Sequence, residues 1–149
     1  MKTVSKINIA LELLGSMSHY VIEVSTKSGQ NFVEITPMII EQVKRSGVKN
    51  GVCFIYVPHT TAGVTLNENA DTSVAKDILN TLNRLIPVDS EYNHFEGNAH
   101  AHIKASIVGH NATLLVEEGE LVLGTWQGVF LCEFDGPRRR RILVKIVGE

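Results

Sequence analysis

Four short apolar runs lie close together in the last part of the chain, and they restrict the fold more than any other feature. They are ATLLVEE (112–118), ELVLG (120–124), GVFLCEFD (128–135) and RRRILVKIVG (139–148), with one to three residues between each run and the next. Runs of this length, bounded by glycines, are typical of β-strands. Connections this short cannot hold the crossover of a dozen or more residues that joins parallel strands. This part of the chain therefore predicts antiparallel strands.

Further strands are predicted in the first half of the chain. Residues 5–13 (SKINIALEL) and 19–26 (HYVIEVST) alternate polar and apolar side chains, which is the pattern of a half-buried strand. Residues 51–58 (GVCFIYVP) are nearly all apolar, which predicts a strand covered on both faces. Residues 63–69 (GVTLNEN) are long enough for one more short strand.

Two segments have the signals of helices. In the segment 35–47, Thr36 is a suitable N-cap, Pro37 fits the first turn, and Gly47 stands where a helix usually ends. The second helix is expected from Asp71 to Leu85, where apolar residues recur at helical spacing. Its apolar positions are Val74, Ala75, Ile78, Leu79, Leu82 and Leu85.

The order of these elements predicts a mixed α+β fold with a mostly antiparallel sheet system. No repeat or linker divides the chain, so residues 1–149 are expected to form a single domain. Hydrophobic residues make up 44% of the chain and charged residues 20%, as in soluble globular proteins. Cys53 and Cys132 each lie in an apolar run, which predicts buried, unpaired thiols with a structural role.

Composition also restricts location and partners. No apolar run approaches the roughly 20 residues of a membrane helix, and the N-terminus lacks the pattern of a signal peptide. We therefore expect a cytoplasmic protein without a membrane partner. A net charge of −2 argues against a nucleic-acid partner, because such proteins usually carry a strongly basic surface.

The stretch HFEGNAHAHIKAS (94–106) contains three of the six histidines. In a strand, His100 and His102 would share one face, whereas in a helix they would point about 200° apart. Asn98 before the segment and Gly109 after it favour a short helix. In that case His94, on the preceding loop, is the better companion for His102. Two histidines and a carboxylate are enough for a divalent metal such as zinc, but polar residues at a helix start explain the stretch as well.

A second group of polar residues follows the apolar strand, in HTTAGVTLNENAD (59–71). Loops at the ends of buried strands commonly carry reactive groups. His59 is a candidate acid, base or metal ligand, and Glu68 or Asp71 is a candidate base or ligand. A turn followed by a helix cap would explain the segment from Asn67 to Asp71 equally well.

Trp126 and the arginines 138–141 complete the candidate features. Trp126 is expected in the core or in a contact between subunits, and less often such a residue stacks on a ligand. Consecutive arginines in a strand point to alternate faces, so at most two of them can bind one phosphate. Alternatively, the arginines protect an edge strand and pair with the acidic segment 117–120.

Taken together, the segments 59–71, 98–106, 106–129 and 132–141, including GTWQ at 124–127, resemble the YjbQ family, also called UPF0047. The resemblance implies a two-sheet β-sandwich with two main helices and a short one, assembled as a homotrimer with Trp126 near an interface. Members are labelled secondary thiamine-phosphate synthases, which join hydroxymethylpyrimidine diphosphate to thiazole phosphate and release diphosphate. The matching polar positions, to which the resemblance assigns no roles, are His59, Thr60, Asn67, Glu68, Asp71, His94, His102, Gln127 and Glu133.

Two functional hypotheses follow. The first is a trimeric, metal-assisted enzyme acting on a phosphorylated heterocycle, with catalytic His59, Glu68 and Asp71 and with metal ligands His59, His94 and His102. The second is a binding protein that holds a phosphorylated metabolite or a metal without turnover. In either case the site can combine His59 of one chain with His102 of another. The residues expected to contact the substrate are Thr60, Thr61, Asn67, Gln127, Arg138 and Arg140.

Overall fold

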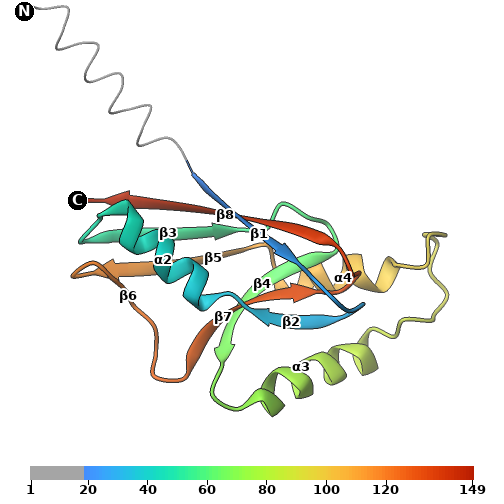
Figure 1. Cartoon of the computed structure of the whole chain (residues 1–149). Helices are drawn as coiled ribbons and strands as arrows, with labels where there is room; N and C mark the ends of the chain where they lie inside the picture. The colour runs from blue at the N-terminus through green and yellow to red at the C-terminus, as the bar shows by residue number, and fades with distance from the viewer. Residues whose placement is uncertain (1–18) are drawn as a thin grey trace, which may run out of the picture.

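The protein was analysed as a computed structural model that describes residues 19–149 (Figure 1). The predicted strand at 5–13 lies outside the described residues. The elements in chain order are β1 (Tyr20–Ser25), β2 (Asn31–Glu34), α2 (Thr36–Ser46), β3 (Gly51–Tyr56), β4 (Ala62–Glu68), α3 (Thr72–Leu85), α4 (Ala99–Val108), β5 (Asn111–Glu117), β6 (Glu120–Leu121), β7 (Gln127–Glu133) and β8 (Arg139–Gly148). This is the α+β fold that the sequence predicts, and the three helices and most of the strands lie near their expected places, but strand β2 was not predicted.

The strands form two sheets in which every neighbouring pair is antiparallel. The larger sheet has the order β1-β8-β3-β5-β6, and the smaller has the order β2-β7-β4. Strand β8 lies between β1 and β3, so the prediction of an edge strand for the arginine segment is wrong. Its length of ten residues explains this position, because it can pair along both neighbours at once.

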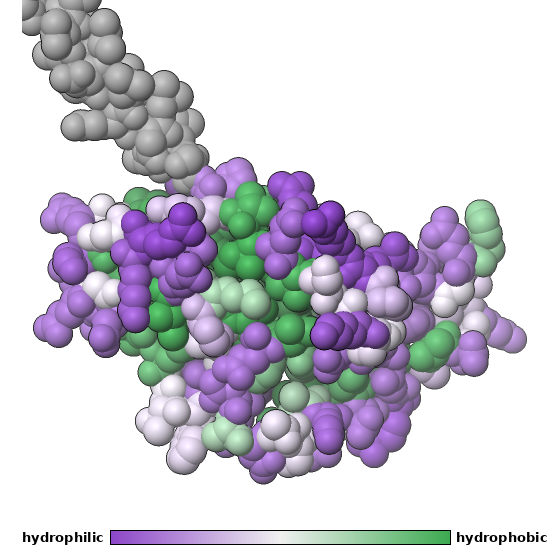
Figure 2. All heavy atoms as spheres, in the orientation of Figure 1, coloured by the Kyte–Doolittle hydropathy of each residue, from purple (hydrophilic) through white to green (hydrophobic). Residues whose placement is uncertain are grey.

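The main core lies between the two sheets and α2. Helix α2 contributes Ile39 and Val43, which are almost completely buried, and packs against β6, β8 and β7. In Figure 1 this helix crosses in front of the sheets, and Figure 2 shows the same side as largely hydrophilic, with apolar atoms between the elements. Burial of one such side chain contributes about 1.5–3 kcal/mol. A second, smaller cluster lies on the other face of the smaller sheet and consists of Ala101, Ala105, Cys132 and Phe134.

The helix boundaries show which of the predicted caps are used. Gly47 ends α2 with a φ of 70°, as expected for a glycine at this position. Thr36 is the first residue of α2 and does not cap it, because its hydroxyl accepts a hydrogen bond from Val129 N in β7. Asp71 caps α3, where its carboxylate accepts from Ser73 N. The histidine stretch is helical in α4, so the short helix was the correct alternative.

Strand β3 is covered on one face only, contrary to the prediction. Cys53 and Ile55 are fully buried, whereas Phe54 and Tyr56 are 46% and 50% exposed. The alternation means that the larger sheet faces the core with one side and leaves the other side open. Cys53 and Cys132 are free and buried, as predicted, and burial raises the pKa of the Cys53 thiol to about 11. No helix within residues 19–149 is long and apolar enough to cross a membrane.

Candidate functional site

A buried ion pair between Glu133 and Arg140 organises the region where β7 ends and β8 begins. Both residues are almost inaccessible, at 0% and 3% exposure. Arg140 Nε donates to both carboxylate oxygens of Glu133, at 2.9 and 3.1 Å. Thr26 Oγ1 donates to Glu133 Oε1 at 2.7 Å, and Thr61 Oγ1 accepts from Arg140 Nη2 at 2.8 Å. The pair therefore joins β7 and β8 to the residue that follows β1 and to the loop that precedes β4.

This arrangement changes the expected role of Arg140. Its guanidinium is buried and hydrogen-bonded to Glu133 and Thr61, so little of it is accessible to a substrate in this chain, and the predicted substrate contact stays a prediction. Strand alternation was the correct reasoning, because it places Arg139 and Arg141 on the opposite, exposed face. Arg139 pairs there with Glu23 at 3.3 Å, and not with the acidic segment 117–120. Arg141 is exposed beside it.

The imidazole of His59 is held by the backbone of Arg141. Its Nε2 accepts the backbone N–H of Arg141 at 2.9 Å, so the neutral ring carries its proton on Nδ1. Burial, followed by the charge of Arg140, lowers the pKa of His59. The ring is therefore neutral at physiological pH and presents an N–H donor. In this arrangement it is neither a free base nor a free metal ligand, because its lone pair is already used.

Glycine at position 63 allows the segment after His59 to pass close to α4. A Cβ atom at Gly63 would lie 2.5 Å from the carbonyl oxygen of Gly109, at the end of α4. The same carbonyl accepts the N–H of Val64 at 3.0 Å. This contact between the start of β4 and the end of α4 positions the loop that carries His59, Thr60 and Thr61. Thr60 is exposed, whereas Thr61 is buried against Arg140.

Asp135 forms a second polar cluster at the start of α4. Its Oδ2 accepts from Asn98 Nδ2 and from Arg138 Nη2, both at 2.9 Å. Partial burial raises the pKa of Asp135, but the bonds from Asn98 and Arg138 and the nearby arginine charges outweigh this, and the net pKa is lowered. Asn98 thus joins α4 to β7 and does not cap its own helix. Arg138 is half exposed and remains accessible to a ligand.

His94 and His102 come together on the outer side of α4. Their rings meet edge to face, with centroids 5.2 Å apart, and Glu96 Oε2 lies 3.5 Å from His94 Nε2. The two histidines line an open hollow together with Tyr92 and Ile103. Within residues 19–149, no group of three or more histidine, cysteine or acidic side chains is arranged to hold a metal. The predicted triad of His59, His94 and His102 is therefore not assembled within one chain.

The remaining predicted residues lie at the opposite end of β4. Six residue steps separate Ala62 from Glu68, which at about 3.3 Å per step places them roughly 20 Å apart. Glu68 therefore cannot reach His59 within one chain. Asn67 Oδ1 accepts from Glu68 N, and Gln127 Oε1 accepts from Gly124 N. Asp71 caps α3 through Ser73, and these bonds lower its pKa, so the structure gives it a structural role, while its predicted role as a catalytic base stays a prediction.

Trp126 is not part of the core, contrary to the first expectation for this residue. Its side chain is 62% exposed, and it lies in the turn closed by Gln127 and Gly124. The carbonyl of Trp126 accepts the N–H of Asn69 at 3.0 Å, which attaches the turn to the segment after β4. A subunit contact or a ligand contact therefore remains as the expected role of the side chain.

Sequence reasoning missed a buried lysine on α4. Lys104 is fully buried, and its Nζ contacts Asn83 Oδ1 at 2.6 Å, His100 Nδ1 at 2.8 Å and Gln30 Oε1 at 3.3 Å. Burial lowers the pKa of Lys104, and burial together with the Lys104 charge lowers the pKa of His100. The spacing of four residues on a helix was the available signal, since it places both side chains on the same face.

Comparison with known proteins gives consistent matches over the described part of the chain. The family model described as "UPF0047 protein YjbQ-like" matches residues 20–149. The UPF0047 protein MJ1081 of Methanocaldococcus jannaschii is 53% identical over 127 residues, which cover 85% of this chain and 92% of that protein. The UPF0047 protein YugU of Bacillus subtilis is 43% identical over 128 residues, which cover 85% of this chain and 97% of YugU.

Solved structures show the same fold. A crystal structure of a YjbQ/UPF0047 protein from Clostridium acetobutylicum, described as an ortholog of YugU, has a TM-score of 0.85 at 46% identity and covers 86% of this chain and 99% of that one. A YbjQ-like protein of unknown function from Sulfolobus solfataricus has a TM-score of 0.85 at 40% identity, with 89% and 97% of the two chains covered.

Proposed function

The chain belongs to the YjbQ-like UPF0047 family, and on this premise we propose that it is an enzyme acting on a phosphorylated heterocycle at the exposed start of β8. The proposed reaction is that of a secondary thiamine-phosphate synthase. The observation that carries the proposal is the position of His59, whose ring is fixed by the backbone N–H of Arg141 at the start of β8, where Arg139 and Arg141 are exposed.

The chemistry of this transfer suits the groups present. The thiazole nitrogen attacks the methylene carbon of the pyrimidine, the carbon–oxygen bond breaks, and diphosphate leaves with the electron pair. The attacking nitrogen carries no proton, so the step needs no general base, which agrees with the occupied lone pair of His59. What the step needs is neutralisation of the departing charge. Guanidinium groups and N–H donors provide it, and the donors in question are Arg138, Arg139, Arg141, Thr60 and the Nδ1–H of His59.

We also propose that the active form is a homotrimer. The outer face of the larger sheet, formed by Val21, Val52, Phe54, Tyr56, Leu115 and Val147, is apolar and exposed or half-exposed. An apolar face of this kind is typical of a protein contact. Arg139 and Arg141 lie on the same side of β8, so a second copy placed on this face would cover the phosphate-binding groups.

A divalent metal is not assigned to the reaction. The three predicted ligands do not fit one metal site within a chain, because His59 lies apart from the other two and its Nε2 is hydrogen-bonded. His94 and His102 are the residues that would hold a metal with a further ligand from another copy.

A binding protein without turnover is the second candidate, and one observation favours it. The described acidic and imidazole groups near β8 are engaged in structural bonds: Glu133 with Arg140, Asp135 with Asn98, and His59 with Arg141. A site of this kind can hold a phosphorylated metabolite firmly without changing it.

A single-turnover assay with enzyme in excess over hydroxymethylpyrimidine diphosphate and thiazole phosphate tests the two candidates. The enzyme hypothesis predicts thiamine phosphate and diphosphate in equal amounts, and a rate at least about tenfold lower in Arg141→Met, since a hydrogen bond to a charged group is worth about 1.5–3 kcal/mol. Arg45→Met, at an exposed position on α2, is the matched control.

Titration with inorganic diphosphate provides the second measurement. Saturable binding that weakens in Arg141→Met, without product formation, would favour the binding protein. If the wild type neither binds diphosphate nor forms product, both candidates are wrong for the start of β8.

A further inference from the structure

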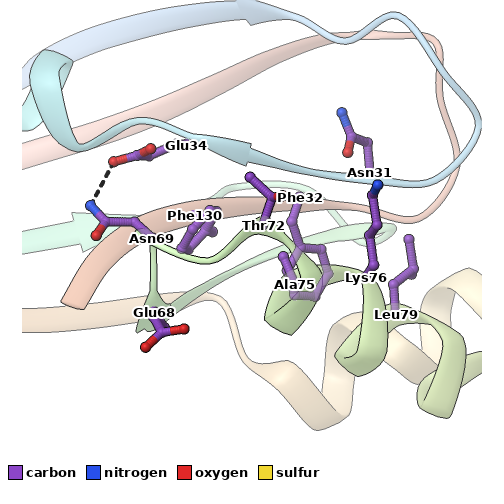
Figure 3. Close-up of a pocket in the computed structure, with 10 residues that line it drawn as sticks. All are labelled: Asn31, Phe32, Glu34, Glu68, Asn69, Thr72, Ala75, Lys76, Leu79 and Phe130. Carbon is purple, nitrogen blue, oxygen red and sulfur yellow. Dashed lines mark hydrogen bonds between the residues drawn. The ribbon is translucent and has the colours of Figure 1, made fainter. Parts of the chain in front are cut away.

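A pocket of about 280 Å³ lies between β2 and α3, away from the start of β8 (Figure 3). Its existence follows from the loose packing of α3. None of the residues of α3 is fully buried, whereas α2 buries four, and the stripe of α3 that faces the smaller sheet is only half covered. Figure 2 shows the resulting hollow between β2 and α3 at the surface. We call it the β2–α3 pocket; its lining residues include Phe32, Phe130, Ala75, Leu79, Glu34 and Lys76.

The floor of the β2–α3 pocket is aromatic and apolar. The rings of Phe32 and Phe130 are inclined at 43° with centroids 6.4 Å apart, and Ala75 and Leu79 of α3 complete the apolar lining. Figure 3 shows both rings between the strand and the helix. Aromatic rings attract planar ligands by stacking and attract cations through the negative charge on their faces. A small pocket of this size and lining suits one or two fused rings.

The polar residues are arranged asymmetrically around this floor. Glu34 lies at the end where α3 begins, and its Oε1 accepts from Asn69 at 2.8 Å; Glu68 lines the same end. Lys76 and Asn31 lie at the other end. Within residues 19–149 neither carboxylate forms an ion pair. Two carboxylates against one ammonium leave the lining with a net charge of −1.

We propose that the β2–α3 pocket binds a small planar aromatic cation, such as an aminated or protonated nitrogen heterocycle. The ring of this ligand lies against Phe32 and Phe130, and its N–H groups donate to the carboxylate of Glu34. Charge complementarity selects the cation over an anion of the same shape, because the lining contains two carboxylates and neither forms an ion pair within the described residues. The site is distinct from the proposed phosphate site, and the proposal does not depend on any activity at β8.

Three probes of similar shape test the proposal: 2-aminobenzimidazole as the cation at slightly acidic pH, indole as the neutral ring, and indole-3-acetate as the anion. Binding is followed by backbone amide shifts in two-dimensional NMR spectra of the full chain. We expect the cation to bind more tightly than indole, with the largest shifts at β2 and the first turns of α3, and the anion to bind weakest.

Variants separate the contributions of charge and shape. Glu34→Gln keeps the hydrogen bond with Asn69 and removes the negative charge. It should weaken binding of the cation about tenfold. Lys76→Met removes a positive charge that repels the cation, so it should strengthen binding of the cation. Ala75→Leu fills the pocket and should abolish binding of every probe. Glu41→Gln, an exposed acid on α2, is the control and should leave all affinities unchanged.

Folding of each variant is checked by its thermal unfolding and by the spectrum without probe. The proposal is overturned if the cation does not bind at concentrations up to about 10 mM. It is also overturned if indole-3-acetate binds as tightly, or if a folded Glu34→Gln or Ala75→Leu protein binds the cation as the wild type does. None of these results bears on diphosphate binding, so a failure here is distinguishable from a failure of the proposed function.

Discussion

At the scale of single residues, burial decides whether a charged side chain is structural or functional. Arg140 and Arg141 are neighbours in the sequence, yet one is sealed against Glu133 and the other is exposed beside His59. Removal of one partner from a buried ion pair leaves an uncompensated charge, which is far more costly than loss of an exposed pair. The two arginines should therefore respond differently to the same substitution.

We expect Arg140→Met to lower the free energy of unfolding by about 3–5 kcal/mol, because Glu133 remains buried without its partner. Arg139→Met, which removes only the exposed pair with Glu23, should change it by less than about 1 kcal/mol. Urea denaturation of both variants measures the difference. Equal effects would mean that the Glu133 carboxylate finds another partner or takes up a proton.

Protonation of His100 should make stability depend on pH. The unfolded chain binds this proton near the ordinary pKa of 6.5, whereas burial and the Lys104 charge lower the pKa in the folded protein. Asp135 and Asp89 act in the opposite direction without reversing the shift. The unfolded state thus binds more protons as the pH falls below about 6.5, and the free energy of unfolding decreases there.

The variant His100→Gln tests this linkage, because the amide oxygen can still accept from Lys104 while the titrating group is lost. Denaturation midpoints between about pH 7 and pH 5 should fall less steeply than in the wild type. His59 has a shift of the same sign, so a residual slope is expected. An unchanged slope in His100→Gln would contradict the assignment.

At the scale of the elements, the contact between β4 and α4 positions the loop with His59. The backbone of Gly63 passes close to Gly109, and the space left by the missing side chain is occupied by the carbonyl oxygen. On one side of helix α4, His102 contacts the ring of His94 from the preceding loop. On the other side, Lys104 is buried. Displacement of this helix would therefore affect several candidate residues together.

Gly63→Ala should destabilise the protein by about 1–3 kcal/mol, because the new methyl group meets backbone that cannot move independently. Gly29→Ala is the control, since a Cβ atom there would lie 3.8 Å from its nearest neighbour. Urea denaturation gives the stability, and amide shifts of residues 99–109 show whether α4 moves. A Gly63→Ala protein of wild-type stability would show that α4 adjusts without cost.

At the scale of the whole molecule, the outer face of the larger sheet is the feature that a single chain leaves unexplained. Phe54 and Tyr56 of β3 lie at its centre, with Val147 on the neighbouring β8 and Val21 on β1 beyond it. The proposed homotrimer would bury these side chains. It would also bring a second copy next to the exposed arginines of β8.

Light scattering after size-exclusion chromatography tests the assembly. We expect the wild type to elute as a trimer and Phe54→Glu as a monomer, because a charge at the centre of an apolar contact is strongly unfavourable. Phe95→Glu is the control: Phe95 is 94% exposed in the loop before α4, away from this face, and its substitution should leave the trimer intact. A trimeric Phe54→Glu protein would place the contact elsewhere.

Metal content gives a further test at this scale. After mild chelator dialysis, any stoichiometric divalent metal should be lost in His102→Ala and retained in His59→Ala, because the His59 lone pair is used by Arg141. If the third ligand comes from another copy, the Phe54→Glu monomer should lose the metal as well. Loss of the metal in His59→Ala would instead support the original triad, assembled between chains.

The sequence by itself determined the type and order of the elements within the described residues, except for the short strand β2, which was not predicted. Alternation identified β1 and the alternate faces of Arg139 to Arg141, the short connections required antiparallel strands, and Gly47 marked a helix end. The GTWQ segment and its neighbours were enough to identify the family. These features depend on residues close together in the chain, so local rules are sufficient to find them.

Only the tertiary structure decided which polar residues meet. His59 and Glu68 belong to one short segment, yet the extended backbone of β4 separates them, while Thr26 meets Glu133 across 107 residues of the chain. The β2–α3 pocket has the same origin, because Glu34 and Asn69 meet only when β2 and α3 pack on β7 and β4. Sheet pairing and side-chain burial are long-range properties, and the spacing of residues along the chain does not contain them.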